Sequence, residues 1–353
     1  MANQQQKTSI AILLNNQIND SLICMKKSLQ SVSCLVDFVA LSTLGKVVGP
    51  EPIRLCDSPS ELQNYDLIIY QYGCCFLTIS SWLNDYEGKI IIQYNIDHVA
   101  LSNFRAYHHA SSLVHQLELE RQHLAEWVQN NCLRVYWLAG SPAAVTELKS
   151  WGVIDSIKNM AVAPPFLELP AGQYVSEKRR DKTDSSCILV TGPYIPDTGH
   201  IMIVNIIEAY QKSISQNIRL QFIGKAYAEL SVYVEELKSH IKQSDLESNI
   251  YLEFSDRPVQ LETFINADIM LCMINNQQSS PEKLNAQALG LPIVKFTHAE
   301  KLHTVVKLLD QALSNDTIRD KLIINGYRNI SRNYTFSHIE HTFLTSVISA
   351  LGQ

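Results

Sequence analysis

Residues 267–294 read ADIMLCMINNQQSSPEKLNAQALGLPIV, and they are the most informative part of the sequence about the fold. An apolar run predicts a short buried strand, and a polar segment follows it. Ser280 is a preferred helix N-cap residue and Pro281 suits the first helical position, so a helix is expected to begin there. Gly290 is a natural stop for that helix, and a second apolar run predicts the next strand. Free N–H groups at the start of such a helix form a ready-made site for a diphosphate.

The same alternation of short apolar runs and helical periodicity extends along the whole chain. It predicts mostly parallel sheets with crossover helices. In the first half, strands are expected at residues 10–14, 35–40, 67–72, 90–94 and 135–138, and helices at 20–30, 110–129 and 142–150. In the second half, strands are expected at 187–191, 218–222, 250–254, 269–273 and 293–296, and helices at 199–213, 226–242, 260–265, 281–289, 299–313 and 336–351.

A polar stretch separates the two halves. Residues 171–186 read AGQYVSEKRRDKTDSS, which has almost no large apolar side chain and is typical of a solvated linker. We therefore expect an α/β protein with two Rossmann-like domains and a cleft between them. The expected parts are a first domain at 1–170, the linker, a second domain at 187–335, and a C-terminal helix at 336–353 that packs back across the domains. Ligands of such open sheets bind at the carboxyl ends of the strands.

Composition narrows the class of protein. The 353 residues are 46% hydrophobic and 18% charged, which is typical of globular proteins, and the net charge of −6 argues against nucleic acid as a partner. The eight cysteines form no C-x-x-C pair, so buried thiols in a reducing compartment are expected. No apolar run is long enough for a signal peptide or a membrane span, which predicts a cytoplasmic protein. No cluster has metal-ligand spacing, so neither a metal nor another cofactor is expected.

The stretch at 267–294 resembles the donor-site signature of glycosyltransferase family 4. The residues that match this signature without a gap are Ala267, Asp268, Ala286, Ala288, Gly290 and Pro292. Weaker similarity covers nearly the whole chain. Residues 188–200, ILVTGPYIPDTGH, resemble the strand and loop that open the family's donor domain, and residues 308–351 resemble its closing helices. In the first half, the similar positions are Tyr94–Asn95, Arg121, Gln122, Leu124, Ser141, Glu147, Leu148 and Gly152.

The resemblance implies a GT-B fold and a retaining, metal-independent glycosyltransferase. Such an enzyme moves a sugar from a nucleotide-diphosphate donor to a glycan, a lipid-linked acceptor or a protein. A second reading is a catalytically inactive GT-B protein that acts as a binding or accessory subunit of a partner glycosyltransferase. Peripheral membrane association stays open under both readings.

This chain departs from the family at the charged positions of the donor site. The family's two glutamates fall on Gln277 and Asn285, which keep hydrogen-bonding capacity and lose the charge. The family's Arg and Lys, which neutralise the diphosphate, fall on Pro193 and Thr198. Neither of these residues can carry a positive charge, so the accessory-subunit reading stays open.

Other residues are expected to hold the donor. The hydroxyls of Ser279 and Ser280, with the helix N-terminus, are candidates for binding phosphate. The candidates for positive charge are Lys283, Lys225, which follows a predicted strand, and Arg257, on a loop where nucleobase contacts often occur. The remaining donor-site candidates are Gly192, Gln277 and Asn285.

Two residues after a first-half strand are candidates for catalysis. His98 follows Asn95-Ile96-Asp97 and is the best histidine for a sugar contact or a proton relay, with Asp97 as a polar sugar ligand. An ordinary loop position is the alternative for both, because Asp and His are common in turns.

Overall fold

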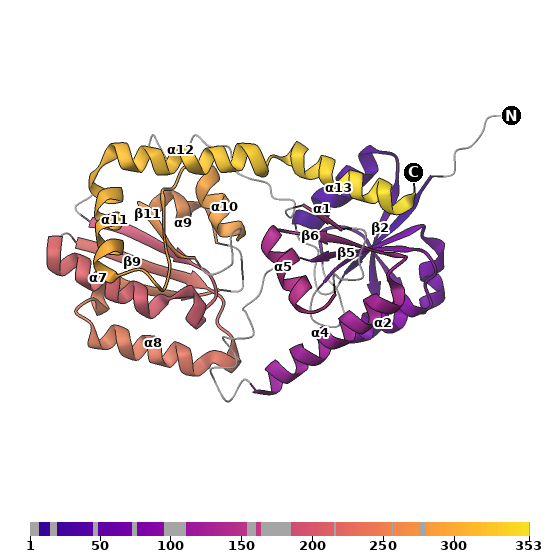
Figure 1. Ribbon diagram of the computed structural model, residues 1–353, viewed down its shortest axis with the longest axis horizontal. Helices are drawn as coiled ribbons and strands as arrows, with labels where there is room; N and C mark the ends of the chain where they lie inside the picture. Colours follow the sequence, from indigo (N-terminus) through magenta and orange to yellow (C-terminus); the bar gives the residue numbers. More distant parts are fainter. Residues whose placement is uncertain are drawn as a thin grey trace. The chain divides into compact units, whose positions relative to one another are not determined.

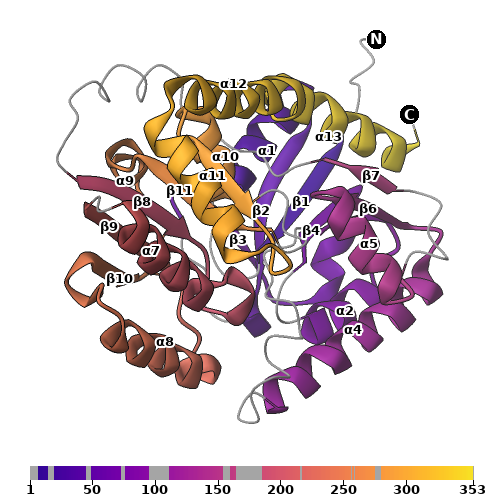
Figure 2. The same ribbon diagram turned by 60° about the vertical axis from the view of Figure 1, so that its left-hand side comes forward.

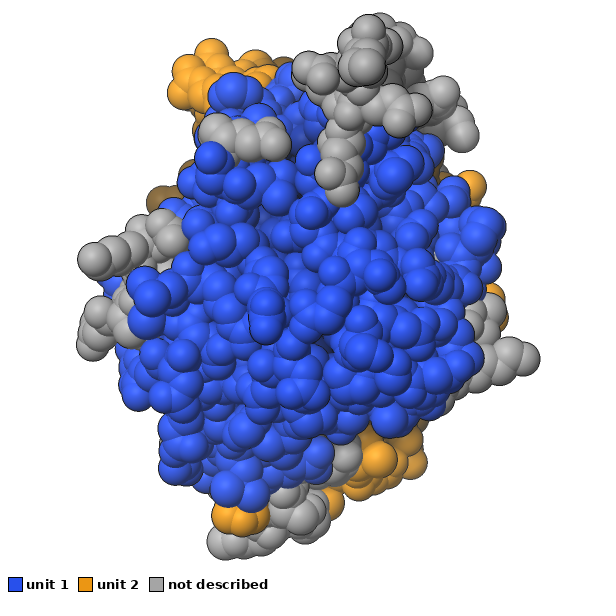
Figure 3. Space-filling view, turned by 90° about the vertical axis from the view of Figure 1, so that its right-hand side faces the viewer, with its two compact units in different colours: residues 1–96, 116–168, 334–353 blue, residues 97–115, 169–333 orange. Residues whose placement is uncertain are grey.

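The computed structural model describes residues 7–14, 20–44, 49–72, 76–94, 111–153, 160–163, 185–214, 217–255, 257, 259–274 and 280–352. The chain divides into two compact units. The first comprises residues 1–96, 116–168 and 334–353, and the second comprises residues 97–115 and 169–333. Figure 3 colours the first unit blue and the second orange. Strands alternate with helices in both units, as the sequence predicts (Figure 1).

The described part of the first unit contains a seven-stranded parallel sheet in the order β3-β2-β1-β4-β5-β6-β7. Its strands are β1 (Ser9–Leu14), β2 (Leu35–Leu41), β3 (Ile53–Cys56), β4 (Leu67–Gln71), β5 (Lys89–Tyr94), β6 (Val135–Ala139) and β7 (Met160–Val162). The central strands are apolar on both faces because helices cover both sides of the sheet. The edge strands β3 and β7 are short and were not predicted from the sequence.

Helices cover the two faces of this first sheet. They are α1 (Asp20–Ser31), α2 (Phe76–Asn84), α4 (Ser111–Asn131), α5 (Pro142–Ser150) and α13 (Phe336–Leu351). Side chains of α2, α4 and α5 form one core with the sheet, and side chains of α1 and α13 form a second core on its other face. The C-terminal helix α13 thus packs on β5, β6, β7 and α1 of the first unit. It is capped by Thr335, whose side chain accepts a hydrogen bond from the backbone N–H of His338.

The described part of the second unit contains a five-stranded parallel sheet in the order β10-β9-β8-β11-β12. Its strands are β8 (Ser185–Thr191), β9 (Asn217–Gly224), β10 (Ile250–Phe254), β11 (Ile269–Met273) and β12 (Ile293–Phe296). All five were predicted from the sequence. Strand β8 begins two residues earlier than predicted, because Ser185 and Ser186 pair with the start of β9.

The helices of the second unit also lie on both faces of its sheet. They are α7 (His200–Ile214), α8 (Ser231–Gln243), α9 (Leu261–Asn266), α10 (Pro281–Ala288), α11 (Leu302–Ser314) and α12 (Asp316–Asn333). Helices α7, α8 and α11 share one core with the sheet, whereas α9 and α10 share the core on the opposite face. Helix α11 lies beside α7, and α12 packs against α10, α11 and β12 (Figure 2).

Candidate functional site

The topological switch point of the second sheet lies between β8 and β11. From β8 the chain proceeds through α7 to β9 on one side, and later returns to place β11 on the other side of β8. Ligands of open α/β sheets bind at such a point, at the carboxyl ends of the strands. The pairing of β8 with β11 ends at Leu189 and Met270, although each strand continues beside its other neighbour. The last residues of these two strands therefore do not pair with each other.

The loop after β8 is held tightly against the end of β9. The backbone N–H of Gly192 donates to the carbonyl oxygen of Ile223 at 3.1 Å, and the N–H of Tyr194 donates to that of Lys225 at 2.8 Å. Gly192 has a φ of +132°, which favours glycine at this position. Gly224 lies so close that a Cβ atom on it would overlap the carbonyl oxygen of Gly192. The position of the loop is thus fixed by backbone contacts.

Two buried aromatic side chains anchor the same loop. The Tyr194 hydroxyl lies 3.0 Å from the carbonyl oxygen of Phe222 and 3.2 Å from that of Glu253. Burial raises the pKa of Tyr194, so its hydroxyl keeps its proton and donates. His200, the first residue of α7, stacks on Tyr194 with ring centroids 4.9 Å apart, and its Nδ1 lies 3.2 Å from the hydroxyl of Tyr233.

No positive charge is present on the loop between Gly192 and His200. Thr198 donates a hydrogen bond of 2.7 Å from its hydroxyl to the carbonyl oxygen of Pro193, so the two positions of the family's cations are joined to each other. Burial lowers the pKa of His200 to about 3, which keeps its imidazole neutral near pH 7. Asp197 is the charged residue of this loop.

The start of α10 has the geometry predicted from the sequence. Ser280 is extended, with φ of −69° and ψ of 147°, and its hydroxyl oxygen accepts a hydrogen bond from the backbone N–H of Lys283 at 3.3 Å. Pro281 is the first helical residue, and Gly290 ends the helical segment with a φ of +71°. Helix α10 therefore directs its N-terminus to the carboxyl edge of the sheet, next to the switch point.

The other donor-site candidates lie at several places on this edge. Lys283 is only 4% exposed, and Asn285 is partly buried on the same helix. Lys225 and Arg257 are exposed and follow β9 and β10, on the side of β8 away from β11. The Lys225 ammonium lies 5.3 Å from the centroid of the Tyr227 ring. Candidates outside the described residues are Asp97, His98, Gln277 and Ser279.

Two polar residues at the same edge were missed by sequence reasoning. The hydroxyl oxygen of Thr191, at the end of β8, is buried and has no hydrogen-bond partner. Lys295 on β12 lies opposite Cys272 on β11 in the strand register. Desolvation, together with the charge of Lys283, lowers the pKa of Lys295. The sequence did contain a signal for both residues, namely a polar residue within or at the end of an otherwise apolar strand. In any single strand, this signal is too weak to indicate a binding site.

In the first unit, three of the family-like residues of the first half come together. The hydroxyl of Tyr94 donates to one carboxylate oxygen of Glu147 at 3.0 Å, and the guanidinium of Arg121 lies 3.3 Å from the other. The same guanidinium stacks over Trp151, 4.3 Å from the ring centroid. These polar groups thus satisfy one another at the end of β5.

Two further findings limit the kinds of site. Within the described ranges, no group of three or more His, Cys, Asp or Glu side chains is arranged to hold a metal ion. Among the helices of those ranges, none combines the length and the apolar character that crossing a membrane requires.

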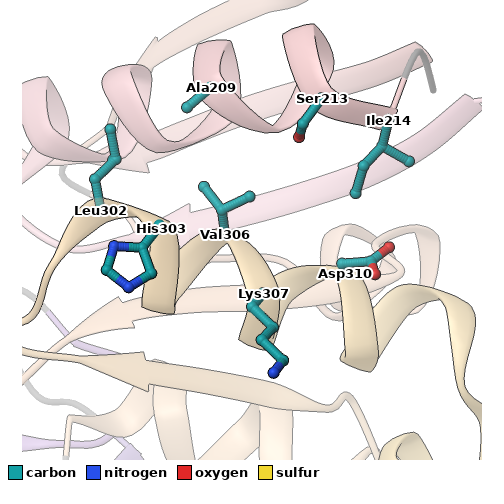
Figure 4. A pocket seen from close by; sticks show the side chains of 8 residues that line it. All are labelled: Ala209, Ser213, Ile214, Leu302, His303, Val306, Lys307 and Asp310. Atoms are coloured by element: carbon teal, nitrogen blue, oxygen red, sulfur yellow. The ribbon is translucent and has the colours of Figure 1, made fainter.

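A shallow apolar groove of about 400 Å³ lies between α7 and α11 of the second unit (Figure 4). Its lining residues are Ala209, Ser213, Ile214, Leu302, His303, Val306, Lys307 and Asp310. Because Ser213 and Ile214 end α7, which begins at the carboxyl edge, the groove lies away from the switch point.

Comparison with known proteins identifies the fold. No protein-family model and no curated protein sequence matches the chain. Among solved structures, HepE of Anabaena in complex with UDP and glucose is 11% identical, with a TM-score of 0.69 over 97% of this chain and 100% of that one. A glycosyltransferase of Rickettsia africae is 12% identical, with a TM-score of 0.61 over 98% and 99% of the two chains. WaaG, a glycosyltransferase of lipopolysaccharide biosynthesis, is 12% identical, with a TM-score of 0.60 over 95% and 98%. The chain therefore has the two-domain, Rossmann-like α/β fold of these GT-B glycosyltransferases.

Proposed function

We propose that this chain is a glycosyltransferase whose second unit binds a nucleotide-sugar donor. The observation that carries the proposal is the capped N-terminus of α10 at the carboxyl edge, beside the β8–β11 switch point. A helix start at this place provides a binding site for a diphosphate. The likeness in fold to HepE, solved with UDP and with UDP-glucose, supports the same assignment.

The chemistry required of this site is stabilisation of a leaving diphosphate. Transfer breaks the bond between the anomeric carbon of the sugar and a diphosphate oxygen, so negative charge develops on the departing group. The positive end of the α10 dipole, equivalent to roughly half an elementary charge, lies where it can oppose that charge. The Asn285 amide, on the same helix, can both donate and accept hydrogen bonds to the donor.

The proposed roles follow the sequence-based assignment. Donor contacts are assigned to Gly192, Lys225, Arg257, Gln277, Ser279, Ser280, Lys283 and Asn285. Asp97 and His98 are assigned to the reacting sugar. The reaction is metal-independent and proceeds with retention, in the cytoplasm, and its acceptor is a glycan, a lipid-linked molecule or a protein.

The Thr198–Pro193 hydrogen bond favours a second candidate function. A loop that carries no positive charge and is closed on itself at the family's cation positions is what a GT-B protein that has lost catalysis would show. In that case the chain is a binding or accessory subunit. The two functions differ in whether nucleotide binding depends on the start of α10.

Substitution of Ser280 tests the proposal. Asp and Asn are both good helix N-caps, so Ser280→Asp and Ser280→Asn keep the helix start and differ only in charge. We expect Ser280→Asp to abolish calorimetric binding of the nucleoside diphosphate that binds the wild type, and Ser280→Asn to retain most of it. Equal binding by the two variants would place the diphosphate elsewhere.

A further inference from the structure

Two strands of the second unit carry a polar side chain near the carboxyl end of one face of the sheet, and the strand between them carries a cysteine there. The residues two positions earlier belong to the core beneath α9 and α10; they are Leu189, Met270 and Ile293. Because side chains alternate along a strand, Thr191, Cys272 and Lys295 share that same face. The three strands are β8, β11 and β12, which are neighbours in the sheet. Thr191 and Lys295 thus place polar groups at the end of the face that α10 covers, where apolar side chains would continue the core.

The hydroxyl of Thr191 is the first sign that these polar groups meet a ligand. Its oxygen atom is buried and forms no hydrogen bond. A buried hydroxyl without a partner is unfavourable, and native proteins rarely keep one without a compensating role. A valine at this position would have the same shape without that disadvantage. The hydroxyl is therefore suited to a polar group that arrives with a ligand.

The two lysines near α10 are the second sign. Lys283 is 4% exposed and lies in the first turn of α10, and its charge contributes to the lowered pKa of Lys295. For Lys295, no described carboxylate forms an ion pair with its ammonium group. Glu282, next to Lys283, is the acidic residue of this turn. The positive charge of Lys283 thus disfavours the charged form of Lys295, and a bound anion would relieve that repulsion.

We propose that Thr191, Lys283 and Lys295 bind the diphosphate of the donor. The positive charge then comes from the α10 side of the switch point and replaces the cations that are missing at Pro193 and Thr198. This inference rests on the proposed function for the identity of the ligand. It adds Thr191 and Lys295 to the residues assigned to the donor site. It also assigns Lys283 and Lys295 to the same bound diphosphate.

The test uses the full-length chain with inorganic pyrophosphate, UDP, GDP, ADP and uridine as probes. The variants are Thr191→Val and Lys295→Met, and Lys242→Met is the matched control. Lys242 is an exposed lysine on α8, on the opposite face of the sheet from Lys295. Lys242→Met therefore changes the net charge by the same amount as Lys295→Met, away from the proposed site. The melting temperature is measured without ligand, and dissociation constants are measured by calorimetry at fixed ionic strength.

We expect Thr191→Val to raise the melting temperature of the free protein by about 2–4 °C, because it removes an unpaired buried hydroxyl. Both Thr191→Val and Lys295→Met should weaken binding of pyrophosphate and UDP by about tenfold or more. Lys242→Met should bind as the wild type does. A substitution that merely damaged the fold would lower the melting temperature, so the opposite changes in stability and affinity separate ligand binding from a structural role.

Failure of the inference and failure of the proposed function give different results. If UDP binds the wild type and both variants equally, the donor function stands and this diphosphate site is wrong. If pyrophosphate binding depends on Thr191 and Lys295 while UDP, GDP and ADP all bind no more tightly than pyrophosphate and uridine does not bind, the anion site stands and the nucleotide-sugar function is wrong. Absence of any binding to the wild type would overturn both.

Discussion

The hydroxyl of Thr198 donates a hydrogen bond of 2.7 Å to the carbonyl oxygen of Pro193, five residues earlier in the chain. These are the two positions at which the resemblance to glycosyltransferase family 4 leads one to expect cations. In this chain they instead close the loop after β8 and leave it without positive charge. A positive charge that neutralises a donor must therefore come from outside this loop.

Replacement of Thr198 tests the structural role of this bond. Thr198→Val keeps the shape of the side chain and removes the donor, so we expect a loss of about 1 kcal/mol in the free energy of unfolding. Thr198→Ser keeps the hydroxyl and should lose less. Denaturant unfolding of the two variants measures the difference, and equal losses would show that the hydroxyl contributes nothing to the loop.

Gly224 is expected to tolerate no side chain. A Cβ atom there would overlap the carbonyl oxygen of Gly192, a residue whose backbone N–H is hydrogen-bonded to the carbonyl oxygen of Ile223 on β9. Gly224→Ala should therefore cost about 3 kcal/mol or displace the loop after β8. Gly152→Ala is the control, because its φ is +73° and no atom lies within 4 Å of the new Cβ. It should cost about 1 kcal/mol. Similar losses in thermal unfolding would argue against the close approach.

His200 should make the second unit sensitive to acid. Its pKa is lowered to about 3 in the folded state, against 6.5 as the usual value, so the unfolded state binds the proton first as the pH falls. Its contribution to stability is complete above about pH 6.5 and is lost progressively towards pH 3. Between pH 7 and pH 5 the loss is about 2 kcal/mol.

His200→Phe should remove this part of the pH dependence. Phenylalanine can preserve the stacking on Tyr194, although it gives up the contact between Nδ1 and the Tyr233 hydroxyl. Urea unfolding of wild type and variant at pH 7 and pH 5 provides the measurement. A wild-type protein that lost no more stability than the variant on acidification would contradict a neutral, buried His200.

Local chemistry explains which parts of the fold were predictable. Strands β8 and β11 of the second sheet contain apolar runs, and Ser280 with Pro281 gives a helix start signal that depends on no distant residue. Strand β3 reads IRLC and has an exposed middle, so it does not stand out as an apolar run. Strand β7 has only three residues. Both lie at sheet edges, where burial on two faces is not required.

The candidate site was predictable only in part, because much of it depends on strand order. In the sequence, Thr191 and Lys295 are separated by 104 positions (295 − 191). The fold brings them near each other because only β11 lies between their two strands, and the alternation of side chains places both on one face of the sheet. No pattern of neighbouring residues in the sequence predicts that arrangement. The hydrogen bond between Thr198 and Pro193 also depends on the turn at 196–198, whereas the sequence alone showed only that both cations were absent.

The central claim is that the second unit binds a nucleoside diphosphate and its sugar conjugate. The most direct measurement is a calorimetric titration of the wild-type chain with UDP, GDP, ADP and CMP and with their common sugar conjugates. We expect that one nucleoside diphosphate binds, that its sugar conjugate also binds, and that the complex is more stable to heat than the free protein. No binding of any of them at millimolar concentration would contradict the account and would favour the inactive GT-B subunit.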